Sequence, residues 1–221
     1  MHNWFVYRKF DDASKAAADS IAEKITDSIR EHNICNVALP GGNSPARCLE
    51  YLAGKSLDWD KIHWYLGDER CVPVGHNDRN DLMLEKHLWS KLVKSHTHTI
   101  PAELGAEAAA ESYANDISSI ECFDIVFLGM GEDGHTASLF PENEALEDSR
   151  TVVPVFHSPK PPSDRVSLSL STIRNARCRI VLTGGTAKSD VIKRIKNNEE
   201  FPINRIGDIV WYIDEAAVSE V

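Results

Sequence analysis

Apolar residues recur at two different spacings along this chain, and each spacing predicts one kind of secondary structure. Between residues 14 and 30 they recur every three or four positions, which indicates an amphipathic helix. The apolar face of this helix comprises Ala18, Ile21, Ala22, Ile25 and Ile29. Residues 123–131 (FDIVFLGMG) are almost continuously apolar and end in glycines, which is typical of a strand buried on both faces.

The two patterns alternate through the rest of the chain. Further strands are predicted at 4–10, 36–39 and 62–66, weaker ones at 151–156, 165–170, 179–183 and 209–213, and further helices at 45–53, 81–91, 105–119 and 186–196. Short apolar strands that alternate with amphipathic helices indicate an α/β fold, in which helices cover both faces of a parallel sheet. The chain has 221 residues, and we expect residues 1–221 to form a single domain.

Charge and composition narrow the range of possible partners and cellular locations. The formal net charge is −10, so we expect a surface that repels nucleic acids and anionic membranes. No apolar run approaches the roughly 20 residues that span a bilayer, and the N-terminal residues lack the order of a secretory signal. Five scattered cysteines without a CxxC pair indicate reduced thiols: Cys35, Cys48, Cys71, Cys122 and Cys178. We therefore expect a cytoplasmic protein, and the sequence defines no oligomeric state.

A glycine-rich turn, LPGGNSP at residues 39–45, follows one predicted strand and leads directly into a helix. Gly41 and Gly42 let the backbone approach a ligand closely, and the helix N-terminus offers unpaired N–H groups to a phosphate. Taken alone, the turn fits an ordinary strand-to-helix connection equally well. Its position matters, because parallel sheets bind ligands beyond the carboxyl ends of their strands.

Charged residues follow the next predicted strand. Asp68, Glu69 and Arg70 come directly after residues 62–67, and Asn80 follows farther along. They lie where the rim of a ligand site is expected. As an isolated cluster, the three charged residues fit a solvated, mutually paired group better than a site.

The strand at 123–131 leads into a segment with candidate catalytic residues. His135 lies just past the strand and next to Gly134, in a setting rich in glycine. Histidine titrates near neutral pH, so it can take a proton from water and return it. Asp133 can orient the imidazole or fix its tautomer. A lone histidine is more often structural, and the glycine and aspartate around this one favour a functional role.

Cationic residues on later loops complete the candidate site. Lys160 and Arg165 belong to the segment SPKPPSDR, and Lys188 follows the glycines of LTGGTAK at the start of a predicted helix. Of the three, Lys188 most resembles a phosphate clamp. His96 and His98 lack the spacing of a metal site, so we predict no metal. No GxSxG segment is present, so a serine-hydrolase mechanism lacks its usual platform.

In their order along the chain, four segments resemble the 6-phosphogluconolactonase family, within the larger group that also contains glucosamine-6-phosphate deaminases. They are LPGGNSP, DERCVP with Asn80, FDIVFLGMGEDGHTASLFP, and PKPPSDRVSLSL followed by LTGGTAK, and DGHTASLFP is the most specific. The resemblance implies a three-layer α/β/α, Rossmann-like fold with a mostly parallel central sheet, and no metal or organic cofactor. One departure is Arg79, which precedes Asn80 where a serine is usual.

The resemblance also implies an activity: hydrolysis of 6-phospho-D-glucono-1,5-lactone to 6-phospho-D-gluconate, the second step of the oxidative pentose phosphate pathway. His135 is then the general base, with Asp133 beside it. The expected partner is a small phosphorylated sugar lactone. The candidate substrate-binding residues are Gly41, Gly42, Ser44, Asp68, Arg70, Asn80, Gly134, Lys160, Arg165 and Lys188.

Two alternatives stay open at this point. A glucosamine-6-phosphate deaminase-type isomerase has a similar glycine turn, but its motif resembles DGHxAFNEP, with an acid placed to assist the histidine. Here Ser138-Leu-Phe-Pro141 occupies those positions. A sugar-phosphate sensor without turnover is the other alternative. Sensors of this kind often carry an added DNA-binding or partner domain, and we expect none here, because the predicted elements leave no spare segment and no basic patch among these residues.

Overall fold

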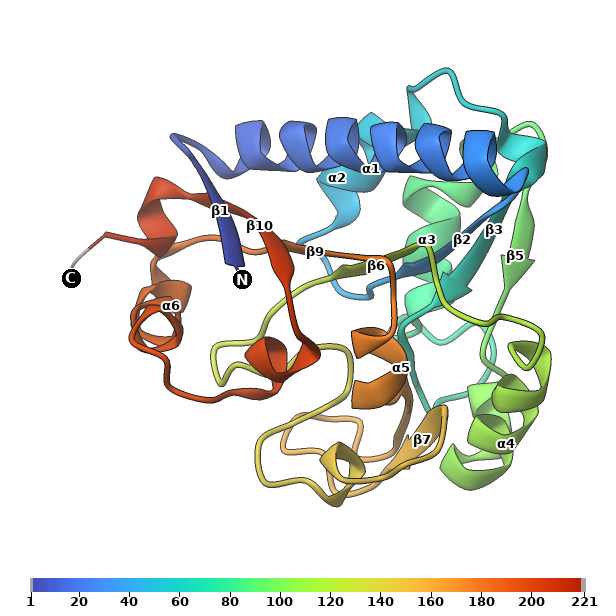
Figure 1. Cartoon of the computed structure of the whole chain (residues 1–221). Coiled ribbons are helices and arrows are strands. Elements are labelled where there is room, and N and C mark those ends of the chain that lie inside the picture. The colour runs from blue at the N-terminus through green and yellow to red at the C-terminus, as the bar shows by residue number, and fades with distance from the viewer. Residues whose placement is uncertain (1, 220–221) are drawn as a thin grey trace.

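The computed structural model describes residues 2–219, and its strands form two sheets (Figure 1). The main sheet has seven strands in the order β1-β10-β9-β6-β2-β3-β5, and every pair in it is parallel. Its strands are β1 (His2–Tyr7), β2 (Cys35–Leu39), β3 (Ile62–Leu66), β5 (His96–His98), β6 (Ile125–Leu128), β9 (Cys178–Leu182) and β10 (Ile209–Asp214). The predicted parallel sheet is confirmed.

Helices cover the main sheet on both sides. The α-helices are α1 (Phe10–His32), α2 (Ala46–Ala53), α3 (Asn80–His87), α4 (Ala106–Asp116), α5 (Leu170–Arg174) and α6 (Ser189–Lys196). Helices α1 and α2 lie on one side of the sheet, and α4, α5 and α6 lie on the other (Figure 1). This arrangement confirms the predicted three-layer α/β/α fold.

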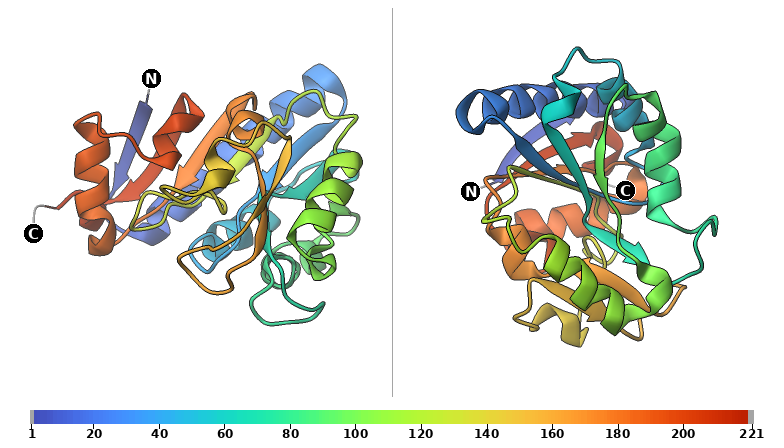
Figure 2. Two further views of the ribbon diagram at one scale, coloured as in Figure 1. Left: turned by 90° about the horizontal axis from the view of Figure 1, so that it is seen from below. Right: turned by 90° about the vertical axis from the view of Figure 1, so that its right-hand side faces the viewer.

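A second, smaller sheet has three antiparallel strands in the order β4-β8-β7. They are β4 (Asp68–Arg70), β7 (Val152–Val155) and β8 (Arg165–Leu168). Two views perpendicular to Figure 1 show β7 and β8 outside the row of parallel strands (Figure 2). The weak strands predicted at 151–156 and 165–170 therefore exist, but they pair with each other and with β4.

The strands of the main sheet supply most of the core. All four residues of β6 are buried, as the continuous apolar run predicted, and β2 and β3 are buried except at one position each. Helix α1 buries Ile21 and Ile25 completely, so its predicted apolar face is the one that packs on the sheet. This buried centre fixes the strand ends, where the polar segments begin.

Several predicted boundaries were wrong. The strand predicted at 4–10 ends at Tyr7, and Phe10 is already the first residue of α1. Asp11 and Asp12 follow in the first turn, where negative charge favours a helix N-terminus. The helix predicted at 81–91 stops at His87, and the one predicted at 186–196 opens with a 3₁₀ turn. Strands β4 and β5 and helix α5 were not predicted.

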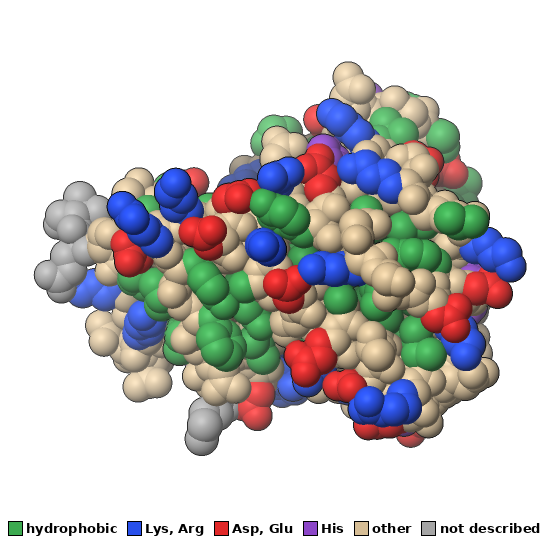
Figure 3. All heavy atoms as spheres, turned by 90° about the horizontal axis from the view of Figure 1, so that it is seen from above, with side chains coloured by type: hydrophobic (Ala, Val, Ile, Leu, Met, Phe, Trp, Pro, Cys, Tyr) green, Lys and Arg blue, Asp and Glu red, His purple; other side chains and the backbone are tan. Residues whose placement is uncertain are grey.

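Charged side chains of both signs are interspersed on the face that includes α1, where Figure 3 shows no large area of one sign. The net charge of the whole chain is −10. Among the described residues, no helix combines the length and the apolar character needed to cross a membrane.

Candidate active site

A pocket of about 230 Å³ opens at the carboxyl ends of the central strands, next to the small sheet. It brings together most of the predicted site residues: Gly41, Gly42, Ser44, Asp68, Arg70, His135, Lys160, Arg165 and Lys188. Asn80, Asp133 and Gly134 do not line it. Asn80 and Asp133 instead hydrogen bond to the lining residues Asp68 and His135, and Gly134 directly precedes His135.

The pocket also has lining residues that were not singled out from the sequence. They are Pro40, Pro45, Gly129, Met130, Gly131, Ala137, Leu182 and Thr183. Each lies within or directly beside a segment already recognised by its glycines or by the DGH motif. Their proximity in the sequence to these segments was therefore the signal by which they could have been predicted.

His135 is held by a short contact with the carboxylate of Asp133. The distance from His135 Nδ1 to Asp133 Oδ1 is 2.5 Å, and 17% of the His135 side chain is exposed. Burial alone would raise the pKa of Asp133, but the hydrogen bond and charge of His135 and the charge of Lys160 hold that pKa well below its ordinary value. Because the carboxylate is ionised, Nδ1 donates to it, and Nε2 of the neutral ring is left as an acceptor.

Glycine is required at two positions around His135. A Cβ atom at Gly131 would lie 2.0 Å from His135 Nδ1, and one at Gly134 would lie 2.5 Å from the ring of Phe201. Gly134 also has a φ of +74°, in the left-handed region that favours glycine. The backbone of the turn is closed by a hydrogen bond from Gly131 N to the His135 carbonyl, 2.9 Å. Gly131 therefore leaves the room that the imidazole occupies, and Gly134 leaves the room for the Phe201 ring.

Asp68 lines the pocket, and its carboxylate is held from two sides. Ser138 Oγ donates to Asp68 Oδ2 at 2.6 Å, and Asn80 Nδ2 donates to Asp68 Oδ1 at 3.3 Å and to the Asp68 carbonyl at 2.8 Å. All three side chains are buried. Ser138 belongs to the DGHTASLFP segment, and sequence reasoning missed its contact with Asp68 because the two residues are far apart in the chain.

Arg165 is buried, and most of its hydrogen-bonding groups contact the backbone. Its guanidinium donates to the carbonyls of Lys160, Pro161 and Pro162 at 2.9 to 3.2 Å. Nη1 lies 3.5 Å from Ser138 Oγ. Burial lowers the pKa of Arg165 from its ordinary value. These contacts fix the loop that carries Lys160, which lines the pocket.

Two lysines face acidic residues of the segment before His135. Lys160 Nζ lies 3.8 Å from Asp133 Oδ2, and Lys188 Nζ lies 4.0 Å from Glu132 Oε1. Burial lowers the pKa of Lys188, and the charge of Glu132 opposes that shift. Both ammonium groups are within a pocket that is otherwise rich in glycine, so they form a local positive region in a chain of net negative charge.

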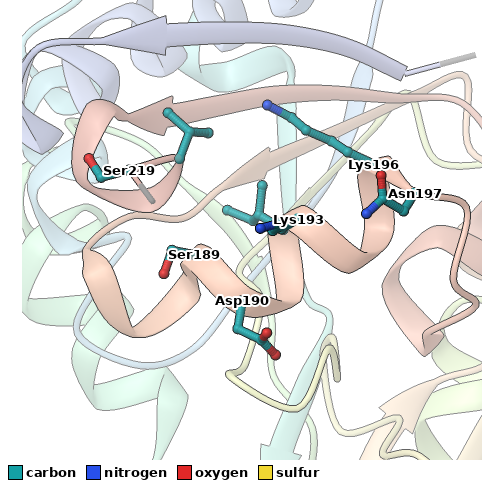
Figure 4. Close-up of a pocket in the computed structure, with 8 residues that line it drawn as sticks. Ser189, Asp190, Lys193, Lys196, Asn197 and Ser219 are labelled. Atoms are coloured by element: carbon teal, nitrogen blue, oxygen red, sulfur yellow. The ribbon is translucent and has the colours of Figure 1, made fainter. Parts of the chain in front are cut away.

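A larger hollow of about 470 Å³ lies along α6 and is shown in Figure 4. Its side chains include Ser189, Lys193, Lys196 and Ser219. None of the predicted site residues lines it. Size alone therefore does not mark the site, since the smaller pocket holds the histidine and the glycine turn.

The described part of the chain contains no cluster of three or more His, Cys, Asp or Glu side chains arranged to hold a metal ion. His63, His96 and His98 do lie together at the edge strand β5. Their rings stack, with centroids of His63 and His96 4.6 Å apart. Metal-independent activity remains a prediction.

Comparison with known proteins identifies the family. The family model described as glucosamine-6-phosphate isomerases/6-phosphogluconolactonase matches residues 8–211. The chain belongs to this family. The match includes all the segments that line the pocket, from the glycine turn to Lys188.

Relatives named 6-phosphogluconolactonase are similar over most of this chain. The protein from Synechocystis is 32% identical, over 89% of either chain, and the human protein is 40% identical, over 70% of this chain and 67% of its own length. The rabbit GDH/6PGL endoplasmic bifunctional protein is 35% identical over 92% of this chain. The present chain spans only 28% of that relative's length.

Solved structures have the same fold. The 6-phosphogluconolactonase from Thermotoga maritima superposes with a TM-score of 0.91 at 26% identity, covering 97% of this chain and all of that one. The enzyme from Trypanosoma brucei gives a TM-score of 0.88, also at 26% identity, over 98% of this chain and 97% of its own. A monomeric glucosamine-6-phosphate deaminase gives 0.84 at 18% identity over 97% of this chain, which establishes a shared fold.

Proposed function

We propose that this chain is a 6-phosphogluconolactonase, which hydrolyses 6-phospho-D-glucono-1,5-lactone to 6-phospho-D-gluconate. The observation that carries the proposal is the His135–Asp133 pair, which lies beside lysines and a glycine turn in one pocket. A base next to an anion-binding surface suits the hydrolysis of an ester that itself bears a phosphate. The reaction is the second step of the oxidative pentose phosphate pathway, and we place the protein in the cytoplasm.

His135 acts as the general base in this mechanism. Asp133 keeps Nδ1 protonated, so Nε2 accepts a proton from the attacking water. The oxygen of that water adds to the lactone carbonyl, and nearby N–H groups and cations stabilise the oxyanion. The imidazolium then protonates the departing ring oxygen. General-base catalysis of this kind contributes about 10²–10⁴-fold.

The phosphate binds where positive charge and backbone N–H groups meet. Lys160, Lys188 and Arg70 are the cations, and the turn of Gly41, Gly42 and Ser44 is the backbone surface. Arg165 contributes mainly by fixing the Lys160 loop, because its guanidinium already binds backbone carbonyls there. Asp68, held by Asn80, accepts hydrogen bonds from sugar hydroxyls, and Gly134 gives the His135 turn its shape.

The contact between His135 and Phe140 favours lactone hydrolysis over isomerisation. Phe140 occupies the position at which the isomerase-type motif has its assisting acid, and its ring centroid lies 4.5 Å from that of His135. The carboxylate hydrogen bonded to the imidazole is therefore that of Asp133. One carboxylate is sufficient for a base that moves a single proton from water and back.

The direct experiment is a rapid assay on lactone freshly made by glucose-6-phosphate dehydrogenase. We expect a lactonase rate well above spontaneous hydrolysis, unchanged by EDTA, and no ammonia from glucosamine 6-phosphate. Ammonia release without lactonase activity would establish the isomerase alternative. Binding of 6-phosphogluconate without turnover would establish the sensor.

A further inference from the structure

One completely buried acid next to the pocket has no part in the mechanism above. Glu69 is the middle residue of β4, between the pocket residues Asp68 and Arg70, and its exposure is 0%. A carboxylate in such a place requires hydrogen bonds that offset the loss of water. Its partners show what it holds together.

The Glu69 carboxylate connects both ends of the loop that joins β4 to α3. Oε1 accepts from the backbone N–H groups of Arg70 and Asn80, each at 2.8 Å. Oε2 accepts from the backbone N–H of Asp81 at 3.0 Å. All three partners are donors, so the ionised carboxylate matches its surroundings.

Arg79 adds charge to the same buried cluster. Its side chain is 3% exposed, and its Nε lies 4.0 Å from Glu69 Oε2. The guanidinium also contacts Asp81 at 2.7 Å and Glu103 at 3.0 Å, and donates to the Ile100 carbonyl. The residue that departs from the usual serine therefore lies in the interior and anchors the loop.

The cluster reaches the pocket through Asn80. Glu69 fixes the backbone of Asn80, whose side chain then donates to the carbonyl and carboxylate of Asp68. The same side chain fills the space beside Gly41, where a Cβ would lie 1.8 Å from Asn80 Oδ1. A displaced Asn80 would therefore move both Asp68 and the glycine turn.

We propose that Glu69 is a positioning residue of the substrate site: its buried carboxylate ties β4 to the start of α3 and so holds Asn80, Asp68 and the turn at Gly41 in place. This inference rests on the proposed function, in which the turn at Gly41 and Asp68 bind the substrate. The imidazole itself is held by Asp133 on the segment that follows β6, and that segment meets the cluster through Ser138, which donates to Asp68. Loss of Glu69 therefore weakens substrate binding more than the chemical step.

The test compares Glu69→Gln with Glu103→Gln at pH 8. Both variants remove one carboxylate from Arg79, but Glu103 belongs to the turn Ala102–Leu104 and does not line the pocket. We expect Glu69→Gln to raise KM for the lactone about tenfold with kcat nearly unchanged, and Glu103→Gln to leave both unchanged. A merely structural defect lowers the active fraction, so it would reduce kcat and leave KM alone.

Two further measurements keep the inference falsifiable. Asn80→Ala removes the link itself and should raise KM by a similar factor, even if Glu69→Gln folds poorly. Calorimetry with 6-phosphogluconate should show the same weakening of binding, and it needs no turnover. A parent chain that binds this product but lacks lactonase activity would refute the proposed function and leave the Glu69 comparison standing. A KM and product affinity equal to the parent's in Glu69→Gln, or in Asn80→Ala if the first variant is unfolded, would overturn the inference.

Discussion

His135 has two ring nitrogens, and its surroundings give each of them a different task. Nδ1 lies 2.5 Å from Asp133 Oδ1, while the ring lies in the pocket wall against Phe140. The pKa of Asp133 is held well below its ordinary value, so the carboxylate stays charged throughout the neutral range. The DGH motif predicted the contact between the two residues, because a spacing of two allows it. It could not predict the packing of Phe140.

Replacing Asp133 by Asn tests the tautomer. The amide has nearly the same shape but can donate to Nδ1, which would move the ring proton to Nε2 and remove the base. We expect kcat to fall by about 10²–10⁴-fold, with KM changed little. The measurement is steady-state lactonase kinetics. The exposed Asp190→Asn on α6 is the control, and a kcat in Asp133→Asn equal to that of this control would contradict the role of Asp133.

At the scale of elements, the loop after β6 depends on a glycine that leaves space for the imidazole. Gly131→Ala would place a Cβ 2.0 Å from His135 Nδ1. We expect the ring to shift and kcat to fall by about 10²-fold, since displacement by about 1 Å has that effect. Gly54→Ala, where the new Cβ meets only ordinary contacts of 3.5 Å and more, is the matched control. Parent activity in Gly131→Ala would mean that the imidazole is not fixed as described.

Because Glu69 is buried under the loop from β4 to α3, we predict that the stability of the protein depends on pH. Burial raises the pKa of Glu69 from 4.5 to about 7, against the opposing hydrogen bonds from the backbone of Asn80, Arg70 and Asp81. The folded state therefore binds this proton more tightly than the unfolded state. The resulting stability is complete below pH 4.5 and is lost as pH rises through about 7. The loss amounts to about 3 kcal/mol at most.

Urea unfolding at pH 5 and pH 8 measures this effect. The groups that face Glu69 are the Arg79 guanidinium, the Asp81 carboxylate, the Cys71 thiol and three backbone N–H groups. Burial raises the pKa of Cys71 to about 11, so this thiol does not titrate between pH 5 and pH 8. We expect Glu69→Gln to lose part of the decrease in unfolding free energy between the two pH values, because the amide does not titrate. Glu103→Gln should keep the decrease of the parent. An identical decrease in all three proteins would show that Glu69 does not titrate in this range.

Elements with a regular pattern could be predicted from the sequence, and those defined by distant partners could not. Strand β6 and helix α1 each have a long apolar pattern, so their existence and faces were clear. Strand β4 is only three residues long, and all three are charged, so it has no apolar pattern. It is a strand because it pairs with β8, far along the chain. The same distance hid the contact between Asp68 and Ser138.

At the scale of the whole molecule, the fold brings the site residues together at the carboxyl ends of the central strands. In the sequence these residues are spread from Gly41 to Lys188. The order of strands places β9, β6, β2 and β3 side by side, so the segments that follow them meet. The chain as a whole has a net charge of −10, but two lysines and two arginines line the pocket. The site is therefore a positively charged region in a negatively charged protein. The glycine turns and cations predicted where the site lies, but only the packing shows which groups touch.

The account depends on His135 as the base that activates water. The most direct measurement is the lactonase rate of His135→Ala, together with calorimetric binding of 6-phosphogluconate to the same protein. We predict a loss of about 10²–10⁴-fold in kcat, with the product bound about as tightly as by the parent because the lysines and the glycine turn remain. Full turnover by a folded His135→Ala protein would contradict the account.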